Sequence, residues 1–259
     1  MEQAILTPLQ MREVFHLEFL RWFLRKVKAE HYALKGGVNM RFFFRSVRYS
    51  EDMDLDARGI SVAALQEKVM TVLGSASFAE SLRSFGIRTV AAPDLSVAKQ
   101  TETTQRFKVH LGTASGEELF TKIEFSRRGS TGTVNVESVS DAVLRPYRLA
   151  PLLVAHYDAR TAIAQKISAL GSRAVLQARD IFDLFVLRSQ VADASGVTVA
   201  AAALNKARER VFEAEFELFR DTVVAYLSAE DQDSYAQASA WEEVKLSVAE
   251  FLERISAHG

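Results

Sequence analysis

Three aspartates stand at alternate positions in one short stretch of the chain, at Asp52, Asp54 and Asp56. In a strand, residues two apart point to the same face and lie about 6–7 Å apart, so we expect Asp52 and Asp54 to project side by side. Two carboxylates that close repel each other, and a bound divalent cation is the usual remedy. The spacing therefore predicts that Asp52 and Asp54 are metal ligands, with Asp56 at the start of a loop. The alternative is an acidic strand end exposed to solvent.

A glycine pair, Gly36-Gly37, precedes the acids. Glycine has no side chain to keep a phosphate away from the backbone N–H groups. The pattern around the pair predicts a short strand over 32–34 and a helix over 38–44, whose N-terminus would face a phosphate. A phosphate cradle, a helix and then a carboxylate pair on a strand are typical of nucleotidyltransferases of the polymerase-β type.

Nucleotidyl transfer by this chemistry uses a third carboxylate from a neighbouring strand, which completes a second metal site and helps to deprotonate the attacking hydroxyl. Glu124 is the candidate, in a predicted strand over 118–125, and Lys122 shares its face. The alternative is that Glu124 forms a cross-strand ion pair on an exposed face.

A lysine and two further aspartates lie in the second half of the chain. Lys166 falls on an apolar face of a helix predicted over 157–170, where a lysine is costly unless it reaches solvent or meets an anion. Asp180 and Asp183 share one face of the next predicted helix, 175–187. We interpret Asp183 as a residue that orients Lys166 through a salt bridge, and leave the role of Asp180 open.

Ser50 lies two residues before Asp52, so its hydroxyl is expected on the same face, where it could contact a nucleotide phosphate. A phosphoryl group on Ser50 would add about −1.5 to −2 charges beside the metal ligands and act as an off-switch. The alternative is a hydrogen bond from the hydroxyl to local backbone. Arg41 is one of eight basic residues against one acid over 21–48, which indicates either a solvated helix face or a phosphate or RNA contact.

Composition places the 259-residue chain among soluble globular proteins, with 48% hydrophobic and 25% charged residues. The absence of cysteine excludes a disulfide framework and thiolate chemistry. No apolar run approaches the roughly 20 residues of a membrane span, and no secretory signal pattern is seen, so we expect a cytoplasmic protein. The net charge of −1 gives no global indication of nucleic-acid binding.

Helical and strand patterns alternate up to about residue 150, as in a mixed α/β sheet. After Pro151 the pattern is helical, without a strong strand. We predict a nucleotidyltransferase-like α/β domain over 1–150 and an all-α domain over 151–259 that completes the active site. The helices predicted in the second domain span 157–170, 175–187, 199–216, 219–227 and 241–255.

These motifs together resemble the AbiEii-like nucleotidyltransferase toxins of type IV toxin–antitoxin and phage-defence systems, a group that includes the MenT-like enzymes. The resemblance rests on Gly-Gly, fourteen residues, then Asp-x-Asp, with Arg-Tyr-Ser-Glu just before the first acid. It continues at Lys122-Ile123-Glu124, where glutamate replaces the family's aspartate, and at 178–187 (Ala-Arg-Asp-Ile-Phe-Asp-Leu-Phe-Val-Leu). Val38 stands where the family usually has threonine, which removes a hydroxyl from the phosphate loop.

The resemblance implies transfer of a nucleoside monophosphate from a nucleoside triphosphate (NTP) to an acceptor that looks most like the 3′ end of tRNA, which blocks translation. It implies two Mg²⁺ ions about 3.5–4 Å apart, a cognate antitoxin, and a monomer. The alternatives are a small-molecule acceptor such as an aminoglycoside, a protein hydroxyl, or a nucleotide-binding module without catalysis. The residues implied for catalysis are Asp52, Asp54, Glu124, Lys166 and Asp180, and those implied for nucleotide binding are Gly36, Gly37, Arg41, Ser50, Lys122 and Lys166.

Overall fold

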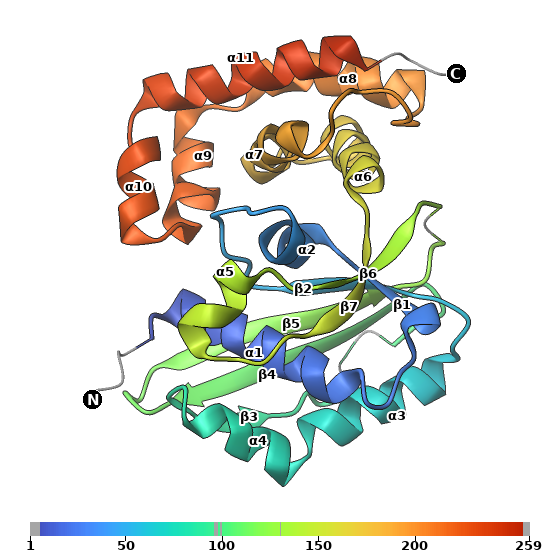
Figure 1. Cartoon of the computed structure of the whole chain (residues 1–259), viewed down its shortest axis with the longest axis vertical. Coiled ribbons are helices and arrows are strands. Elements are labelled where there is room, and N and C mark those ends of the chain that lie inside the picture. The colour runs from blue at the N-terminus through green and yellow to red at the C-terminus, as the bar shows by residue number, and fades with distance from the viewer. Residues whose placement is uncertain (1–5, 96–97, 99, 130, 256–259) are drawn as a thin grey trace. The chain divides into compact units, whose positions relative to one another are not determined.

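The computed structural model describes residues 6–95, 98, 100–129 and 131–255. The chain forms two compact units (Figure 1). The sheet unit comprises the described residues of 1–39 and 49–156, and the helical unit those of 40–48 and 157–259. The short segment 40–48 therefore belongs with helices that follow it by more than 100 positions in sequence.

A mixed seven-stranded sheet has the order β3-β4-β5-β2-β1-β7-β6. The pairs β1–β7 and β2–β5 are parallel, whereas β1–β2, β3–β4 and β4–β5 are antiparallel. Strand β2, which carries the aspartates, is therefore flanked by β1 and β5 and has no open edge. The strands are β1 (Tyr32–Lys35), β2 (Met53–Ala57), β3 (Ile87–Ala91), β4 (Thr104–Thr113), β5 (Glu118–Ser126), β6 (Val134–Ser138) and β7 (Leu153–Tyr157).

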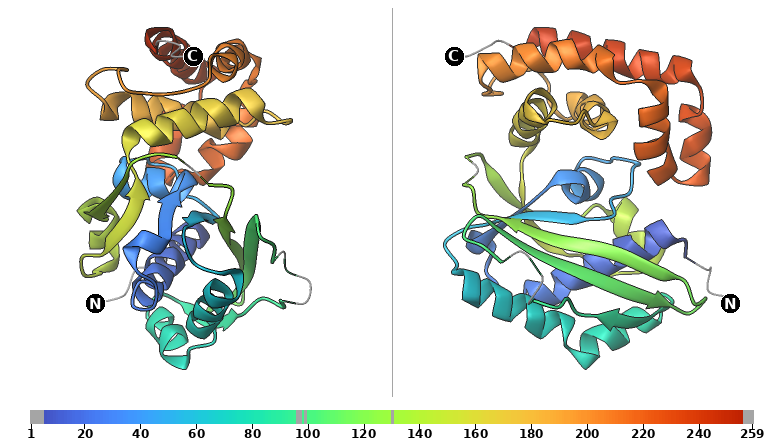
Figure 2. Two further views of the ribbon diagram at one scale, coloured as in Figure 1. Left: turned by 90° about the vertical axis from the view of Figure 1, so that its right-hand side faces the viewer. Right: turned by 180° about the vertical axis from the view of Figure 1, so that it is seen from behind.

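Helices α1 (Pro8–Phe23), α3 (Val62–Leu73) and α4 (Ala76–Arg83) lie side by side on one face of the sheet (Figures 1 and 2). Thr7 and Gln10 form a capping box at the start of α1, and Pro8 occupies its first position. Phe23 at the end of α1 packs on Phe125 of β5, with ring centroids 5.6 Å apart. This aromatic layer anchors α1 to the strand that also carries Glu124.

The helical unit is built around a second core. Trp241 stacks on Phe219 at a centroid distance of 4.2 Å, and its indole N–H donates to the carbonyl of Ala214 at 2.8 Å. Met40 and Phe44, from segment 40–48, are buried in the same core. The helices are α6 (Ala159–Ser172), α7 (Ala178–Leu187), α8 (Ala201–Arg210), α9 (Phe216–Thr222), α10 (Ala229–Tyr235) and α11 (Ala238–Arg254), and α8 and α11 lie side by side (Figure 1).

The predicted fold class is confirmed: a mixed sheet with helices comes first and helices alone follow. Strand β7 contradicts the expectation that no strong strand follows Pro151, and α10 falls outside the helices predicted for the second domain. The structure also contains a short helix, α5 (Asp141–Leu144). Strand β7 reads Leu-Val-Ala-His-Tyr, and periodicity cannot distinguish such a short apolar run from the start of a buried helix. None of the helices in the described parts of the chain is long and apolar enough to cross a membrane.

Candidate functional site

Asp54 is the second residue of β2 and has a charged neighbour on each adjacent strand. Its partner across the antiparallel pair is Lys35 of β1, and its partner across the parallel pair is Glu124 of β5. Directly paired residues of adjacent strands project to the same face of a sheet. Asp52 comes just before β2, and 42% of its side chain is exposed. The strand register therefore brings Asp54 and Glu124 together, and Asp52 lies directly before the first residue of the same strand.

The pKa of Asp54 reflects its burial and the charged residues around it. Burial raises the pKa of the Asp54 carboxyl, the charge of Lys122 opposes that rise, and the neighbouring charges of Glu124 and Asp52 add to it. The net effect is a pKa above the ordinary value of 3.8. A divalent cation at this position would favour the ionised carboxylate and relieve the repulsion.

Protein cations contact the acids in this structure. The Lys122 ammonium lies 3.1 Å from Oδ2 of Asp52 and 3.8 Å from Oε2 of Glu124. The Arg106 guanidinium lies 2.5 Å from Oε2 of Glu124, and the two residues are direct partners across β4 and β5. Glu124 thus forms the cross-strand ion pair that the sequence left open as an alternative to metal binding.

Asp56 does not lie at the start of a loop, as the sequence suggested. It falls within β2, its carboxylate is buried, and it forms an ion pair with Lys35. The alternation of a strand places Asp56 on the face of Asp54, but a lysine from the neighbouring strand already neutralises it.

The acids suit magnesium in their chemistry. Among the described residues, no group of three or more histidines, cysteines, aspartates or glutamates is arranged to hold a metal ion. Mg²⁺ is usually held by one or two carboxylates and completes its shell with water and substrate phosphate. The carboxylate oxygens of Asp52 and Asp54 fit that pattern, with Glu124 as a neighbour tied to Arg106.

Gly36 opens α2 (Gly36–Phe43) directly beside Asp54. Its φ angle is +69°, a left-handed conformation that favours glycine. A β-carbon at Gly36 would lie 2.8 Å from Oδ2 of Asp54, closer than van der Waals contact allows. Both the backbone conformation and the approach of the carboxylate thus require glycine here, so the predicted phosphate cradle adjoins the predicted metal ligand.

We expect Gly36→Ala to reduce nucleotide transfer tenfold or more, because the new methyl group would displace the Asp54 carboxylate. Left-handed strain should also cost about 1–2 kcal/mol of unfolding free energy. Gly116→Ala is the matched control, since Gly116 has φ +86° but no atom within 4 Å of the added carbon. Urea unfolding and transfer assays on both variants check this. Equal transfer rates in the two variants would show that the close approach of Gly36 to the Asp54 carboxylate has no role in nucleotide transfer.

A buried relay supports the backbone just before Asp52. The Thr121 hydroxyl donates to the carbonyl of Glu51 at 2.6 Å, and its oxygen lies 2.9 Å from Nε2 of His16. The Thr121 hydroxyl has one proton, which it donates to the Glu51 carbonyl, so Nε2 of His16 must be the donor in the bond to Thr121. Burial, aided by the Arg12 charge, lowers the pKa of His16 to about 3, so the ring is neutral at physiological pH. No motif in the sequence predicts this contact between α1 and β5.

Replacing Thr121 with valine should cost about 1–3 kcal/mol of unfolding free energy, because the buried Nε2–H of His16 loses its acceptor and the Glu51 carbonyl loses this donor. Thr71→Val is the control, since Thr71 is exposed on α3 and bonds only the carbonyl of Glu67 in its own helix. We expect its effect to stay within about 0.5 kcal/mol. Equal denaturation midpoints for the two variants would rule out a supporting role for the relay.

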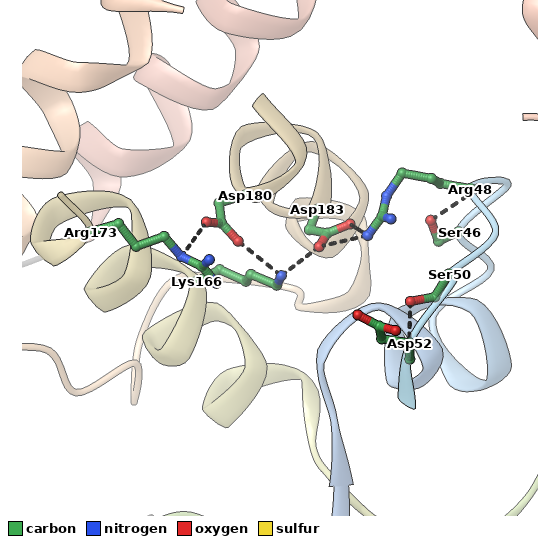
Figure 3. Close-up of polar contacts among 8 residues, drawn as sticks. All are labelled: Ser46, Arg48, Ser50, Asp52, Lys166, Arg173, Asp180 and Asp183. Carbon is green, nitrogen blue, oxygen red and sulfur yellow. Dashed lines mark hydrogen bonds and ion pairs between the residues drawn. The ribbon is translucent and has the colours of Figure 1, made fainter. Parts of the chain in front are cut away.

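In the helical unit, Lys166 lies among buried carboxylates (Figure 3). Its ammonium is 2.6 Å from Oδ2 of Asp183 and 3.1 Å from Oδ1 of Asp180. Asp183 also accepts from Nη2 of Arg48, at 3.2 Å to Oδ1, and Asp180 lies 3.0 Å from Nε of Arg173. The salt bridge expected between Lys166 and Asp183 is present, and Asp180 joins it.

Opposing effects set the ionisation of this buried cluster. Burial alone would raise the pKa of Asp183, but the charges of Arg48 and Lys166 outweigh it and hold the pKa below the ordinary value. Burial likewise favours neutral Lys166, but Asp183 and Asp180 outweigh it and raise its pKa. Asp183 and Lys166 are therefore both charged at neutral pH. The carboxyl groups of Asp183 and Asp180 contact the side chains of Lys166, Arg48 and Arg173.

Two further predicted nucleotide-binding residues contact local backbone. The Ser50 hydroxyl donates to the carbonyl of Asp52 at 2.8 Å, which is the alternative that the sequence left open (Figure 3). Arg41 donates from Nη1 to the carbonyl of Ser46 at 3.1 Å. Arg48 was missed, although it stands in the Arg-Tyr-Ser-Glu motif just before Asp52, which was the available signal.

Solved structures resemble this chain in fold. MenT4, a nucleotidyltransferase toxin from Mycobacterium tuberculosis H37Rv, has a TM-score of 0.59 at 17% identity, over 96% of this chain and 85% of that one. JHP933 from Helicobacter pylori has a TM-score of 0.53 at 19% identity, over 94% of this chain and 91% of that one. At such identities the likeness concerns the fold alone. No curated protein matches the chain.

A family match covers most of the sequence. Residues 18–254 match the family described as "Nucleotidyl transferase AbiEii toxin, Type IV TA system". The matched range includes the glycine pair, the β2 acids, Glu124 and the Lys166 cluster. With the carboxylates of β2 and the glycine beside them in place, the chain belongs to the AbiEii family of nucleotidyltransferase toxins of type IV toxin–antitoxin systems.

Proposed function

We propose that this chain transfers a nucleoside monophosphate from an NTP to the 3′ end of tRNA and releases pyrophosphate. The observation that carries the proposal is the group formed by Asp52, Asp54 and Glu124 next to Gly36, in a member of a nucleotidyltransferase family. A blocked tRNA 3′ end would halt translation, which accounts for toxicity. A separate antitoxin, implied by membership of a type IV system, would neutralise it.

Each acid has a defined task in this reaction. Asp52 and Asp54 would hold Mg²⁺, which when bound would supply Lewis-acid stabilisation of the charge on the phosphates, two ions being the usual number in this chemistry. Glu124 accepts the proton of the acceptor hydroxyl. The hydroxyl oxygen forms a bond to the α-phosphorus, the bond from that phosphorus to the bridging oxygen breaks, and pyrophosphate leaves.

The remaining residues bind and orient the triphosphate. Gly36 and Gly37 present backbone N–H groups at the start of α2, where a helix N-terminus favours an anion. Lys122, within 3.1 Å of Asp52, supplies a positive charge beside the acids. Arg41 and Ser50 are proposed as further phosphate contacts.

Lys166 is proposed as a triphosphate ligand, held in position by Asp180 and Asp183. We expect Lys166→Met to raise the KM for the NTP about tenfold or more, because a charge-assisted hydrogen bond to phosphate contributes about 1.5–3 kcal/mol. Lys166→Arg, which keeps the charge, should recover part of the affinity. Steady-state kinetics over a range of NTP concentrations checks this. An unchanged KM in a folded Lys166→Met variant would make Lys166 a structural residue.

The experiment that tests the proposal is an acceptor panel. The protein is incubated with Mg²⁺ and each labelled NTP, together with total tRNA, an aminoglycoside or a protein mixture. The proposal predicts label on tRNA alone. Label on the small molecule or on protein would keep the chemistry and replace the acceptor, whereas NTP binding without transfer to any acceptor would indicate a binding module. The ion pairs of Lys122 with Asp52 and of Arg106 with Glu124 are the observations that favour this last outcome.

A further inference from the structure

A cavity of about 520 Å³ lies within the helical unit, away from every residue assigned above. It is lined by the loop 191–197, by Arg188 at the end of α7, and by Phe251 and Arg254 in the last turn of α11. Its volume falls in the range of about 300–1,000 Å³ that small-molecule sites occupy. The lining combines apolar side chains with two guanidinium groups, as binding pockets do.

The two arginines of this cavity have no carboxylate partner among the residues that the structure describes. The Arg188 guanidinium lies over the ring of Phe185, 3.7 Å from its centroid, and donates to the carbonyl of the same residue. The Arg254 guanidinium lies 5.9 Å from the ring centroid of Phe251. Each guanidinium carries five N–H donors, so most of the donors in the pair remain available to a ligand.

The acidic residue in the lining is already engaged. Oδ1 of Asp193 accepts from the backbone N–H of Ser195 at 2.8 Å and from the hydroxyl of the same serine. Nη2 of Arg160 lies 3.9 Å from that oxygen. Among the described residues, the Asp193 carboxylate therefore contacts Ser195 and Arg160 and forms no ion pair with Arg188 or Arg254.

Arg188 and Arg254 line the same cavity, so their like charges repel each other. Burial lowers the pKa of Arg188, Tyr235 opposes this, and the charge of Arg254 adds to the lowering. The carbonyl groups at the C-terminus of α11 could offset the positive charge of Arg254. However, the carbonyls of Leu252 and Ile255 already accept hydrogen bonds from the guanidinium of Arg208. A pair of like charges without a counterion favours an anionic ligand.

We propose that this cavity binds a phosphate group, with Arg188 and Arg254 as the side chains that bind it. The pair offers two positive charges, which attract the negatively charged oxygens of a phosphate group. Guanidinium groups also form paired hydrogen bonds to phosphate oxygens. The apolar side chains Val191, Val197 and Phe251 would contact the base or sugar of a nucleotide.

The phosphate has two possible sources, a free nucleotide or the backbone of an RNA strand, and binding assays distinguish them. Inorganic phosphate, AMP and a single-stranded RNA of about ten nucleotides are titrated separately into the full chain by calorimetry, without Mg²⁺. The variants are Arg188→Gln, Arg254→Gln and the double variant. Arg220→Gln is the matched control for each single variant, since Arg220 is exposed in the same unit and its replacement also removes one positive charge.

We expect the double variant to bind at least one of these phosphates tenfold or more weakly, while Arg220→Gln stays within about twofold of the wild type. Affinity lost for the RNA alone would identify the ligand as the phosphodiester backbone of RNA. Affinity lost for inorganic phosphate and AMP would identify it as a free nucleotide. Both results support the proposal. Unchanged affinity for all three probes in a folded double variant would overturn the proposal. Stronger binding of poly-glutamate, titrated in the same way, than of any of the three phosphate probes would also overturn it. Because the assay measures binding without Mg²⁺, its outcome does not depend on the proposed transfer reaction.

Discussion

Replacing Asp54 with asparagine is expected to reduce nucleotide transfer by at least about 10³-fold while leaving the protein folded. The amide keeps the shape of the side chain but removes the charge that would bind the metal, and loss of a metal ligand costs several kcal/mol of transition-state stabilisation. Asp52→Asn should behave in the same way. The measurement is the initial rate of labelled nucleotide transfer at saturating Mg²⁺, and a circular dichroism melt verifies the fold.

The control for Asp54 is Asp56→Asn, a change of the same kind two residues along the same strand. Asp56 is paired with Lys35, so its replacement should lower stability more than it lowers the transfer rate at a temperature where the variant is folded. Wild-type transfer by a folded variant lacking both Asp52 and Asp54 would remove the carboxylate pair from the mechanism.

Asp183→Asn should cost about 3–5 kcal/mol of unfolding free energy. The Asp183 side chain is fully buried between Lys166 and Arg48, and its loss leaves both cations without their shared counter-charge. Urea unfolding at neutral pH measures the change. The control is Asp221→Asn, because Asp221 is exposed in the same unit and forms a surface ion pair with Arg220, so its effect should stay within about 1 kcal/mol.

The lowered pKa of Asp183 predicts that the stability lost in Asp183→Asn depends on pH. The pKa of Asp183 is lowered on folding, so its contribution to stability is present above the ordinary value of 3.8 and is lost as the pH falls through the lower folded-state value. The stability difference between wild type and Asp183→Asn should therefore shrink in that acidic window. A difference that stays constant there would show that Asp183 does not carry the charge in the folded state.

The sequence predicted the candidate site residues that lie within single motifs. The glycine pair, Asp52, Asp54 and Glu124 were predicted from local spacing, and in the structure the register of β2 and β5 places Asp54 beside Glu124. Asp183 was correctly paired with Lys166, because the apolar surroundings of that lysine required an anion.

The partners that the sequence missed come from distant positions. Arg106 meets Glu124 through the register of β4 and β5, and His16 meets Thr121 across 105 positions. Arg48 reaches Asp183 across 135 positions. Side-chain type and spacing do not encode such pairs, because strand register and tertiary packing decide them. For the same reason the Arg188 and Arg254 cavity, whose arginines end two different helices, left no motif in the sequence.

The most direct test of the proposed reaction follows the phosphorus atom. tRNA is incubated with wild-type protein, Mg²⁺ and an NTP labelled either at the α- or at the γ-phosphate, and the RNA is then digested from its 3′ end. Nucleotidyl transfer predicts that the α-label appears on the terminal nucleotide, that the γ-label leaves with pyrophosphate, and that Asp54→Asn shows neither. Transfer of the γ-label to the RNA, or no label from any NTP, would contradict the account.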